Sequence, residues 1–233
     1  MASGRILIIQ NDATENLGLY EKFIRERVEV DVIHAYSLGA KAFPGTEGYS
    51  AFIVGPTPIS ANDVQKHQFL VKEWEYLSRV VGSGKPVLGV CCGGQMLARL
   101  LGAEVVKSPC KEVGGFIVTL TDAGSDDPLF HDFPRDVPVF QWHSDMFKVP
   151  PGGQLLARGD TCPIQAYTWK NVRGLIFHLE IDRHEADRWA SAYPAELEAV
   201  GKTKAQVLEE CQVRESEMRR LAERLVNNFL SLD

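Results

Sequence analysis

The chain has 233 residues, of which 45% are hydrophobic, and a formal net charge of −6 at pH 7. This length and composition predict one large domain with its own core, and the negative charge argues against a nucleic-acid-binding surface. Five cysteines without a paired framework are typical of a reducing compartment, and no apolar run is long enough for a signal peptide or a membrane span, so we expect a cytoplasmic protein with no nucleic-acid or membrane partner.

Short apolar runs alternate with helical patterns in the N-terminal half of the chain. Strands are predicted at Arg5 to Ile9, Val30 to His34, Ala51 to Val54 and Val87 to Val90. A helix is predicted over Gln65 to Val81, where Leu70, Trp74, Leu77 and Val81 recur at helical spacing. This alternation predicts a mostly parallel central sheet flanked by helices.

The fourth predicted strand runs directly into the sequence Gly89-Val90-Cys91-Cys92-Gly93-Gly94-Gln95. A strand followed at once by a helix forces a tight turn, which leaves no room for side chains two residues before and after its apex. Cys91 has glycine at both of those positions, whereas Cys92 does not. Cys91 is therefore the predicted nucleophile, and the helix N-terminus is expected to favour its thiolate. The alternative is that both cysteines are small buried hydrophobic residues.

The pattern changes after Gly114, where short β runs are separated by turns. These runs are Phe116 to Leu120, Val137 to Trp142, Leu155 to Ala157 and Gln165 to Trp169. They predict a small added antiparallel layer. This layer leads back to the main sheet through the apolar run Gly174 to Glu180, which we interpret as a further strand that ends beside Cys91.

His178 and Glu180 lie at the end of this last predicted strand. Residues i and i+2 of a strand share a face, roughly 6.6 Å apart, so Glu180 can bind the imidazole of His178 and fix its tautomer. The pattern predicts a Cys-His-Glu triad, with a buried structural histidine as the alternative. A metal site formed by His178, Glu180, Asp182 and His184 is not expected, because a straight strand carries such residues away from one another.

From about residue 182 to residue 233 the chain is predicted to be a helical extension packed on the domain. Its apolar stripe consists of Met218, Leu221, Leu225 and Phe229, with charged residues on the other faces. Pro194 to Thr203 is interpreted as a short connector. No further domain boundary is expected, so residues 1–233 form a single predicted domain.

The cysteine turn and the segment Phe177-His178-Leu179-Glu180 resemble the class I glutamine amidotransferases, the family that includes the amidotransferase domain of GMP synthetase. Three further segments extend the resemblance over most of the chain, namely Val54-Gly55-Pro56, Gln141-Trp142-His143-Ser144-Asp145 and Cys162-Pro163-Ile164-Gln165-Ala166. The resemblance implies a flavodoxin-like α/β fold and hydrolysis of glutamine without a metal or cofactor.

The resemblance also implies roles for individual residues. Cys91 would be the nucleophile, His178 the base and acid, and Glu180 the carboxylate that orients the imidazole. The backbone N–H groups of Gly55 and Cys92 would form the oxyanion hole. The residues implied to bind the substrate are Gln95, Trp142, His143, Ser144 and Asp145.

The predicted reaction is hydrolysis of the γ-carboxamide of glutamine through a γ-glutamyl thioester, with release of ammonia for an acceptor. The sequence contains neither a phosphate-binding loop nor a recognisable second catalytic domain, so a separate synthetase protein is the expected partner. Two alternatives stay open. One is a self-sufficient γ-glutamyl peptidase or hydrolase, and the other is a catalytically silent binding or regulatory protein with the same fold.

Overall fold

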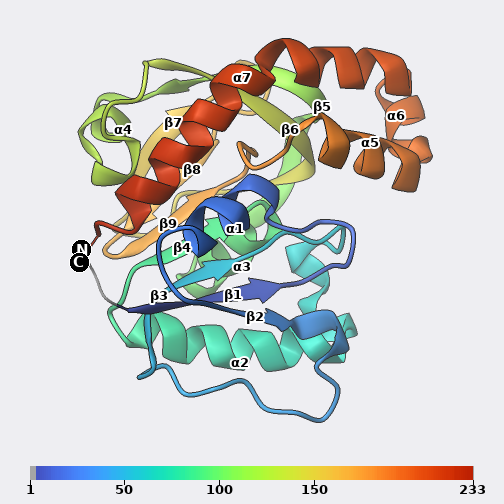
Figure 1. Cartoon of the computed structure of the whole chain (residues 1–233). Coiled ribbons are helices and arrows are strands. Elements are labelled where there is room, and N and C mark those ends of the chain that lie inside the picture. Colours follow the sequence, from blue (N-terminus) through green and yellow to red (C-terminus); the bar gives the residue numbers. More distant parts are fainter. Residues whose placement is uncertain (1–3, 233) are drawn as a thin grey trace.

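The computed structural model describes residues 4–232, which form one mixed sheet with helices on both of its sides (Figure 1). The sheet has nine strands in the order β2-β1-β3-β4-β9-β8-β7-β5-β6. The strands are β1 (Arg5–Gln10), β2 (Val30–His34), β3 (Tyr49–Val54), β4 (Val87–Val90), β5 (Val105–Leu120), β6 (Asp136–Phe147), β7 (Gln154–Arg158), β8 (Ala166–Trp169) and β9 (Val172–Leu175). The helices are α1 (Gly18–Arg25), α2 (Gln68–Gly82), α3 (Cys92–Leu100), α4 (Asp122–Asp126), α5 (Arg183–Ala192), α6 (Pro194–Ala199) and α7 (Lys204–Phe229).

The parallel half of the sheet consists of β2, β1, β3, β4 and β9. Its central strands are short runs of aliphatic and aromatic residues that are buried on both faces, as Ile8, Phe52 and Leu88 show with exposed fractions of 1% or less. The predicted bounds of β2 and β4 are confirmed, and β1 and β3 are each slightly longer than predicted. The parallel sheet with flanking helices is therefore the architecture that the alternating pattern indicated.

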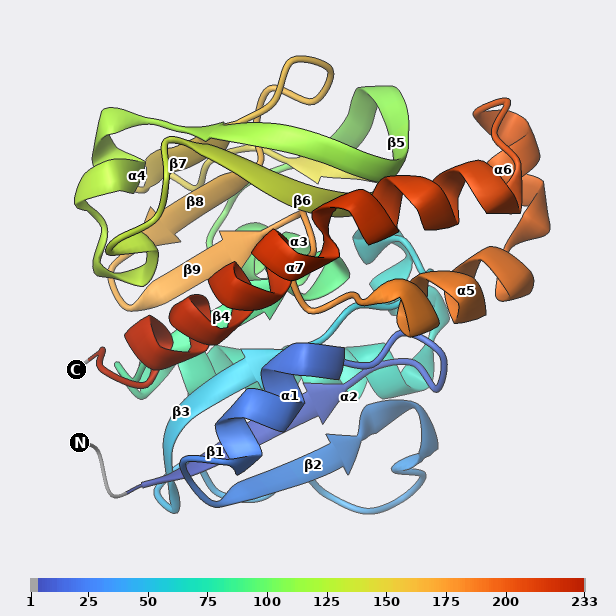
Figure 2. The ribbon, with the colours of Figure 1, turned by 45° about the horizontal axis from the view of Figure 1, so that its top comes forward.

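The antiparallel half consists of β8, β7, β5 and β6, and it lies above the parallel half in Figure 2. Its strands β5 and β6 are much longer than the predicted runs. Because β8 pairs with β9, the antiparallel strands continue the central sheet instead of forming a detached layer. The two halves therefore meet at β9, next to the strand that ends at Cys91.

The chain after β9 differs from the predicted strand. Regular pairing ends at Leu175, so His178 and Glu180 do not lie in a strand. His178 instead forms a single antiparallel bridge with Phe140 of β6, in which the two backbone N–H groups donate to the opposite carbonyls at 2.8 and 2.9 Å. This bridge fixes the backbone of His178 against the antiparallel half.

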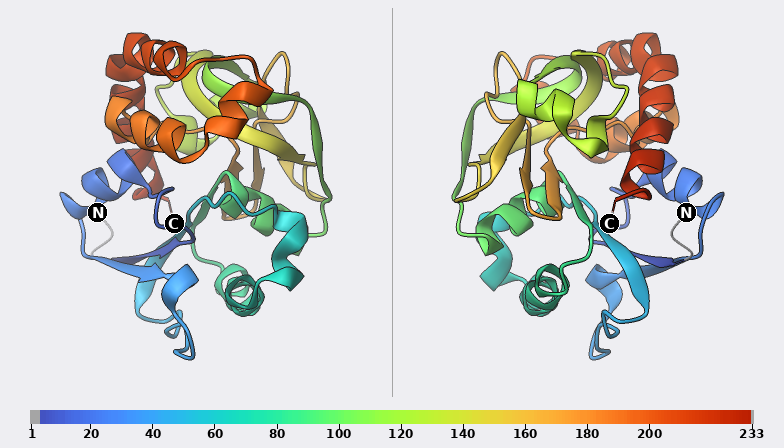
Figure 3. Two further views of the ribbon diagram at one scale, coloured as in Figure 1. Left: turned by 90° about the vertical axis from the view of Figure 1, so that its right-hand side faces the viewer. Right: turned by 90° about the vertical axis from the view of Figure 1, so that its left-hand side faces the viewer.

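The C-terminal helices pack against α1 and against β5 and β6 (Figure 3). The predicted stripe on α7 is confirmed, because Met218, Leu221, Leu225 and Phe229 are all exposed by 1% or less. The segment interpreted as a connector contains the helix α6, which the prediction missed. Within residues 4–232, no helix combines the length and the apolar character that crossing a bilayer requires.

The start of α5 explains why His178, Glu180, Asp182 and His184 do not converge on one metal site. Asp182 caps the helix by accepting a hydrogen bond from the N–H of Glu185 at 2.9 Å, and His184 is an exposed residue of the first turn. His178 and Glu180 are fully buried. The four residues therefore belong to different surroundings.

Candidate active site

Cys91 lies at the turn between β4 and α3 and has a φ of 50° and a ψ of −113°. A positive φ strains a residue with a side chain and persists only where the surrounding structure imposes it. A Cβ on Gly89 would lie 2.6 Å from a backbone nitrogen of α3, and one on Gly93 would overlap the carbonyl oxygen of Val54. Both flanking glycines are therefore needed for the close packing that holds Cys91 in this conformation.

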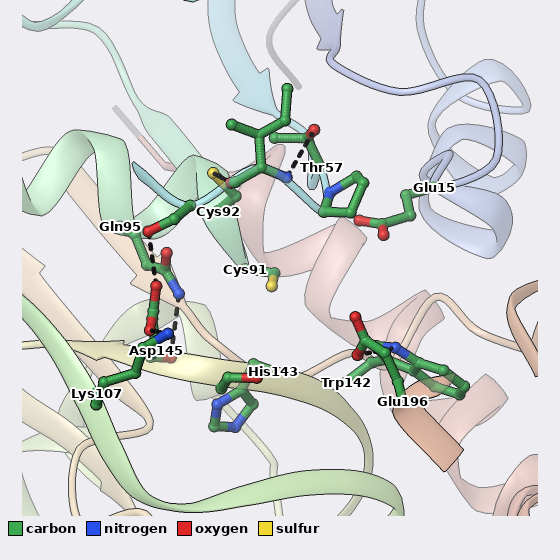
Figure 4. A pocket seen from close by; sticks show the side chains of 14 residues that line it. Glu15, Thr57, Cys91, Cys92, Gln95, Lys107, Trp142, His143, Asp145 and Glu196 are labelled. Atoms are coloured by element: carbon green, nitrogen blue, oxygen red, sulfur yellow. Dashed lines mark hydrogen bonds and ion pairs between the residues drawn. The ribbon is translucent and has the colours of Figure 1, made fainter. Parts of the chain in front are cut away.

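A cavity of about 140 Å³ opens beside Cys91 (Figure 4). Its walls come from the loops after β1 and β3, from α3 and α6, and from β5 and β6. The lining residues are Glu15, Thr57, Pro58, Ile59, Ser60, Cys91, Cys92, Gln95, Lys107, Trp142, His143, Ser144, Asp145 and Glu196. All the residues that the sequence implied for substrate binding therefore line one cavity together with the predicted nucleophile.

The surroundings of Cys91 disfavour the thiolate. Burial raises its pKa well above the ordinary value and the carboxylate of Glu15 raises it further, while the backbone N–H of Cys92 lowers it. The expectation that the helix N-terminus favours the thiolate is thus correct for the N–H of Cys92, but burial outweighs that effect. The thiol needs a base that removes its proton during the reaction.

His178 and Glu180 form a fully buried pair that can supply this base. The Nδ1 atom of His178 lies 2.5 Å from Oε1 of Glu180, and both side chains are 0% exposed. The other ring nitrogen, Nε2, has no hydrogen-bond partner within residues 4–232. The imidazole packs edge-on against Trp189 with 4.9 Å between the ring centroids. Glu180 therefore fixes the ring and leaves Nε2 available.

Strand pairing places the segment that leads to this pair next to Cys91. β4 and β9 are parallel neighbours, and the N–H of Cys91 donates to the carbonyl oxygen of Leu175 at 2.8 Å. Leu175 is the last residue of β9 and precedes His178 by three positions. Cys91 and His178 therefore leave adjacent strands at the same carboxyl edge of the sheet, where ligands bind in open α/β folds.

The two backbone N–H groups implied for the oxyanion hole have different hydrogen-bond partners. The N–H of Cys92, at the start of α3, interacts with the Cys91 thiol. The N–H of Gly55 donates to the carbonyl oxygen of Ile9 at 2.9 Å, and the carbonyl oxygen of Gly55 accepts from Nδ2 of Asn11 at 3.1 Å. Gly55 does not line the cavity. Its predicted role as a donor requires the peptide to rotate away from β1.

One side of the cavity carries Gln95, Asp145 and Lys107 (Figure 4). Gln95 donates from Nε2 to the backbone oxygen of Asp145 at 3.1 Å. The Asp145 carboxylate is 2.6 Å from Nζ of Lys107 and accepts from Oγ of Ser60 at 2.7 Å. The charge on this side is thus compensated within the wall, and backbone and side-chain groups are held in place for a polar ligand.

His143 is positioned by a buried network that sequence reasoning missed. Its Nε2 atom is 2.9 Å from Oε2 of Glu112, which also accepts from Gln165 at 3.0 Å, while the other oxygen accepts from Thr161. Burial raises the pKa of Glu112, but hydrogen bonds led by that of His143 outweigh it and hold this pKa below its ordinary value. Since ionised Glu112 accepts from Nε2, the buried Nδ1 of His143 is left without a partner within residues 4–232.

The same network contains the ligand types of a metal site. Atoms of Glu112, His143 and Cys162 lie within 4.8 Å of one another. Both oxygens of the Glu112 carboxylate already accept hydrogen bonds, however, and burial raises the pKa of the Cys162 thiol. The arrangement is a hydrogen-bond network that orients His143, and the hydrogen bonds on both Glu112 oxygens do not favour a cation there.

The other side of the cavity carries Glu15, Glu196 and Trp142 (Figure 4). Sequence reasoning missed the two glutamates. Glu15 lies in the loop after β1, a position that the carboxyl-edge rule for parallel sheets could have indicated. Glu196 lies on α6 and accepts from Nε1 of Trp142 at 2.9 Å. No local signal could have indicated it, because its segment resembles a connector.

Comparisons with known proteins identify the family and the fold. A family model described as glutamine amidotransferase class-I matches residues 7–189. A solved structure of a glutamine amidotransferase from Thermotoga maritima superposes with a TM-score of 0.90 and 29% identity, covering 100% of both chains.

Two curated relatives show how far the sequence similarity extends. A putative glutamine amidotransferase-like protein, YfeJ, from Salmonella typhimurium is 28% identical over 180 residues, which is 76% of this chain and 75% of the relative. One subunit of the glutamine-hydrolyzing GMP synthase of Pyrococcus furiosus is 36% identical over 107 residues, or 44% of this chain and 55% of that relative. In a match to a GMP synthase from Aeropyrum pernix, the aligned part covers 24% of the relative.

Proposed function

The chain belongs to the class I glutamine amidotransferases, and from that premise we propose that it hydrolyses the γ-carboxamide of glutamine through Cys91, His178 and Glu180. The strained Cys91 at the edge of the cavity is the observation that carries this proposal. It is supported by the buried His178–Glu180 pair, which follows the neighbouring strand at the same edge of the sheet.

In the first half-reaction, Nε2 of His178 takes the proton of the Cys91 thiol, and the sulfur attacks the γ-carbonyl carbon of glutamine. The carbon–nitrogen bond then breaks, and the nitrogen leaves as ammonia with the proton that His178 returns. Glu180 holds the proton on Nδ1 and stabilises the imidazolium while it exists. The product on the protein is a γ-glutamyl thioester.

In the second half-reaction, His178 removes a proton from water, and the resulting hydroxide adds to the thioester carbon. The carbon–sulfur bond breaks, Cys91 recovers its proton, and glutamate is released. The N–H of Cys92 stabilises the oxyanion in both steps. In our proposal Gly55 becomes the second donor once its peptide leaves Ile9 and Asn11, which links full activity to a movement of the loop after β3.

A partner protein fits this requirement for loop movement. The Pyrococcus furiosus relative is named as one subunit of a glutamine-hydrolyzing GMP synthase. We propose that ammonia from this protein likewise passes to a separate synthetase chain. Docking of that partner would rotate the Gly55 peptide and complete the oxyanion hole.

A second candidate function is self-sufficient hydrolysis of γ-glutamyl amides or peptides. It is favoured by the wall that carries Glu15 and Glu196, because this wall extends the cavity beyond Cys91 on the side away from Gln95 (Figure 4). Such space is not needed for the departure of ammonia but can hold a larger leaving group. Both candidates use the same nucleophile, base and thioester.

The test measures glutamate released from glutamine and from a γ-glutamyl peptide, together with covalent labelling of the protein by a glutamine-mimicking electrophile. We expect labelling at Cys91, and loss of both labelling and turnover in Cys91→Ser. Cys92→Ser is the matched control, because it keeps the backbone N–H and removes only the neighbouring thiol. Both labelling and turnover must be measured, because a glutaminase that depends on a partner can react with the electrophile even when its turnover is slow.

The outcomes separate the candidate functions. Faster release from glutamine supports the amidotransferase, and faster release from the peptide supports the hydrolase. A protein that is folded but shows neither turnover nor labelling of Cys91 contradicts both, and would instead be a binding or regulatory protein with this fold.

A further inference from the structure

The two sides of the cavity carry different side chains, which the two ends of a bound γ-glutamyl substrate would contact. His178 protonates the leaving nitrogen, so the leaving group must lie on the side of the imidazole. The ring of His178 packs on Trp189, which packs on Trp142 with 6.0 Å between centroids and donates from Nε1 to the carbonyl oxygen of Thr14 at 3.3 Å. Trp142 and the loop that ends at Glu15 are therefore on the leaving-group side.

The glutamyl end of the substrate would then bind on the opposite side of Cys91. Gln95, Asp145 and Lys107 are grouped there, across the cavity from Glu15 and Glu196 (Figure 4). The acidic side chain of that group, Asp145, is 2.6 Å from Nζ of Lys107. This side thus carries one ion pair with no excess charge, next to which the amino and carboxylate groups of an amino acid could bind.

The leaving-group side has a different charge balance. Glu15 is 4% exposed and lines the cavity, and within residues 4–232 it forms no ion pair with a lysine or arginine. Burial raises the pKa of Glu15 to about 8, and the nearby carboxylates of Asp12, Glu196 and Glu180 add to the effect, while a hydrogen bond from Tyr193 opposes it. A buried acid without a counter-ion becomes ionised readily when a cation binds beside it.

Glu196 and Trp142 complete this side. Oε2 of Glu196 accepts from Nε1 of Trp142 and pairs with Nζ of Lys111, both at 2.9 Å. Within residues 4–232 its other oxygen makes no hydrogen bond. The indole of Trp142 adds an aromatic surface, and aromatic faces attract ammonium groups. Two carboxyl groups and one aromatic ring thus surround the space next to the leaving group. Among the described residues, Lys111 is the cation that pairs with Glu196.

We propose that Glu15, Glu196 and Trp142 form a subsite for a cationic leaving group. The preferred substrate would then be the γ-glutamyl amide of a diamine, whose free amino group is positively charged. This inference rests on the proposed function. The chemistry is the same: Cys91 attacks the γ-carbonyl, the carbon–nitrogen bond breaks, and the amine leaves with the proton from His178. Water then hydrolyses the thioester and glutamate is released.

The experiment compares four substrates by the rate of glutamate release: glutamine, and the γ-glutamyl amides of diaminobutane, butylamine and aminobutanoic acid. The last three have leaving groups of similar length that are cationic, neutral and anionic. A charged hydrogen-bonded contact in a buried site favours its partner on the order of 10- to 100-fold, and we expect kcat/KM for the diaminobutane amide to exceed that for the butylamine amide by such a factor. The anionic amide should be the poorest substrate.

Variants locate the effect in the protein. Glu15→Gln and Glu196→Gln should each reduce the ratio of kcat/KM between the cationic and the neutral amide. Glu198→Gln is the matched control, because it removes an exposed carboxylate from the same helix as Glu196 but outside the cavity. It should preserve the ratio.

Three results overturn the inference. The first is a ratio near one in the unmodified protein, a comparison that needs no variant to fold. The second is a ratio that persists in both Glu15→Gln and Glu196→Gln. The third is the absence of turnover with every substrate and of labelling at Cys91, which rejects the proposed function as well. Hydrolysis of glutamine or of the neutral amide without preference for the cation rejects the subsite alone.

Discussion

The parallel and antiparallel halves of the sheet contribute to the cavity in different ways. The parallel half acts through its backbone: it places Cys91 at a strained turn, directs the N–H of Cys92 to the thiol and holds the peptide of Gly55. The antiparallel half and the helices after it act through side chains, such as the orienting pair of His143 and Glu112. The position of the Cys91 thiol thus depends on chain geometry, whereas the groups around it depend on hydrogen bonds between distant residues.

This difference predicts which substitutions leave the fold intact but remove the chemistry. Glu180→Gln keeps the shape of the side chain and removes the charge that holds the proton on Nδ1 of His178. We expect kcat to fall by roughly 10²–10⁴-fold, because the imidazole loses its fixed tautomer and its electrostatic support. Steady-state kinetics measure this effect, and the melting temperature serves as the control for folding. A kcat within a few-fold of the unmodified protein would contradict the assignment of the triad.

The next largest effect is expected from a change of backbone geometry in the parallel half. Gly93→Ala places a methyl group against the carbonyl oxygen of Val54, so the turn at Cys91 must shift. A displacement of about 1 Å in a reacting group costs about 10²-fold in rate, and we expect losses of that order in turnover and in labelling of Cys91.

Gly82→Ala is the matched control for this prediction. Gly82 is a helical glycine with nothing within 4 Å of an added Cβ. The same substitution there should leave turnover and labelling unchanged and stabilise the helix slightly. If Gly93→Ala behaves like the control, the close approach at the turn is not required for reactivity.

A smaller effect is expected from the network behind His143. Glu112→Gln removes the ionised acceptor of the imidazole and weakens the hydrogen bond that holds the His143 ring. We expect KM to rise by about tenfold with little change in kcat, because the proposed contact of His143 is to the substrate and not to the reacting atoms. Glu104→Gln, at an exposed carboxylate just before β5, is the control. A fall in kcat at constant KM would assign His143 to the chemistry instead.

The last prediction concerns stability and not rate. Glu73 is fully buried under the parallel half, where burial raises its pKa from 4.5 to about 8 against the opposing hydrogen bond from Asn11. Between these two pH values the unfolded chain has lost a proton that the folded protein retains. The contribution of Glu73 to stability is therefore fully present below pH 4.5 and is lost as the pH rises towards 8.

Glu73→Gln removes this titration. We expect the variant to gain on the order of 1–2 kcal/mol relative to the unmodified protein between pH 4.5 and pH 8, since the unpartnered amide donors offset part of the gain. Denaturant unfolding at several pH values measures the difference, with Glu75→Gln on the exposed face of the same helix as the control. If the stability difference between Glu73→Gln and the unmodified protein were the same at pH 4.5 and at pH 8, the Glu73 carboxyl group would not titrate in this range.

The parallel half and the strained turn at Cys91 could be predicted because their signals are local. A run such as Val87 to Val90 is buried on both faces, and the glycines on each side of Cys91 meet a steric condition that spans only a few residues. The predicted strand through His178 and Glu180 was wrong after Leu175, because a single bridge to Phe140 takes the place of regular strand pairing there. The predicted contact between the His178 and Glu180 side chains was confirmed. The resemblance to a family supplied the residues around Gln95 and His143, which no periodicity indicates.

The sequence by itself thus determined the parallel half of the sheet, the thiol at its strained turn and the family. The tertiary structure decided the rest. It formed the hydrogen-bond network of Glu112, placed the carboxylates of Glu15 and Glu196 at the cavity, and set the hydrogen bond of the Gly55 N–H to Ile9. The physical reason is the range of the interactions. Steric and conformational limits act between residues that are close in the chain, whereas burial, charge and hydrogen bonding depend on segments that meet only after the sheet and its helices have packed.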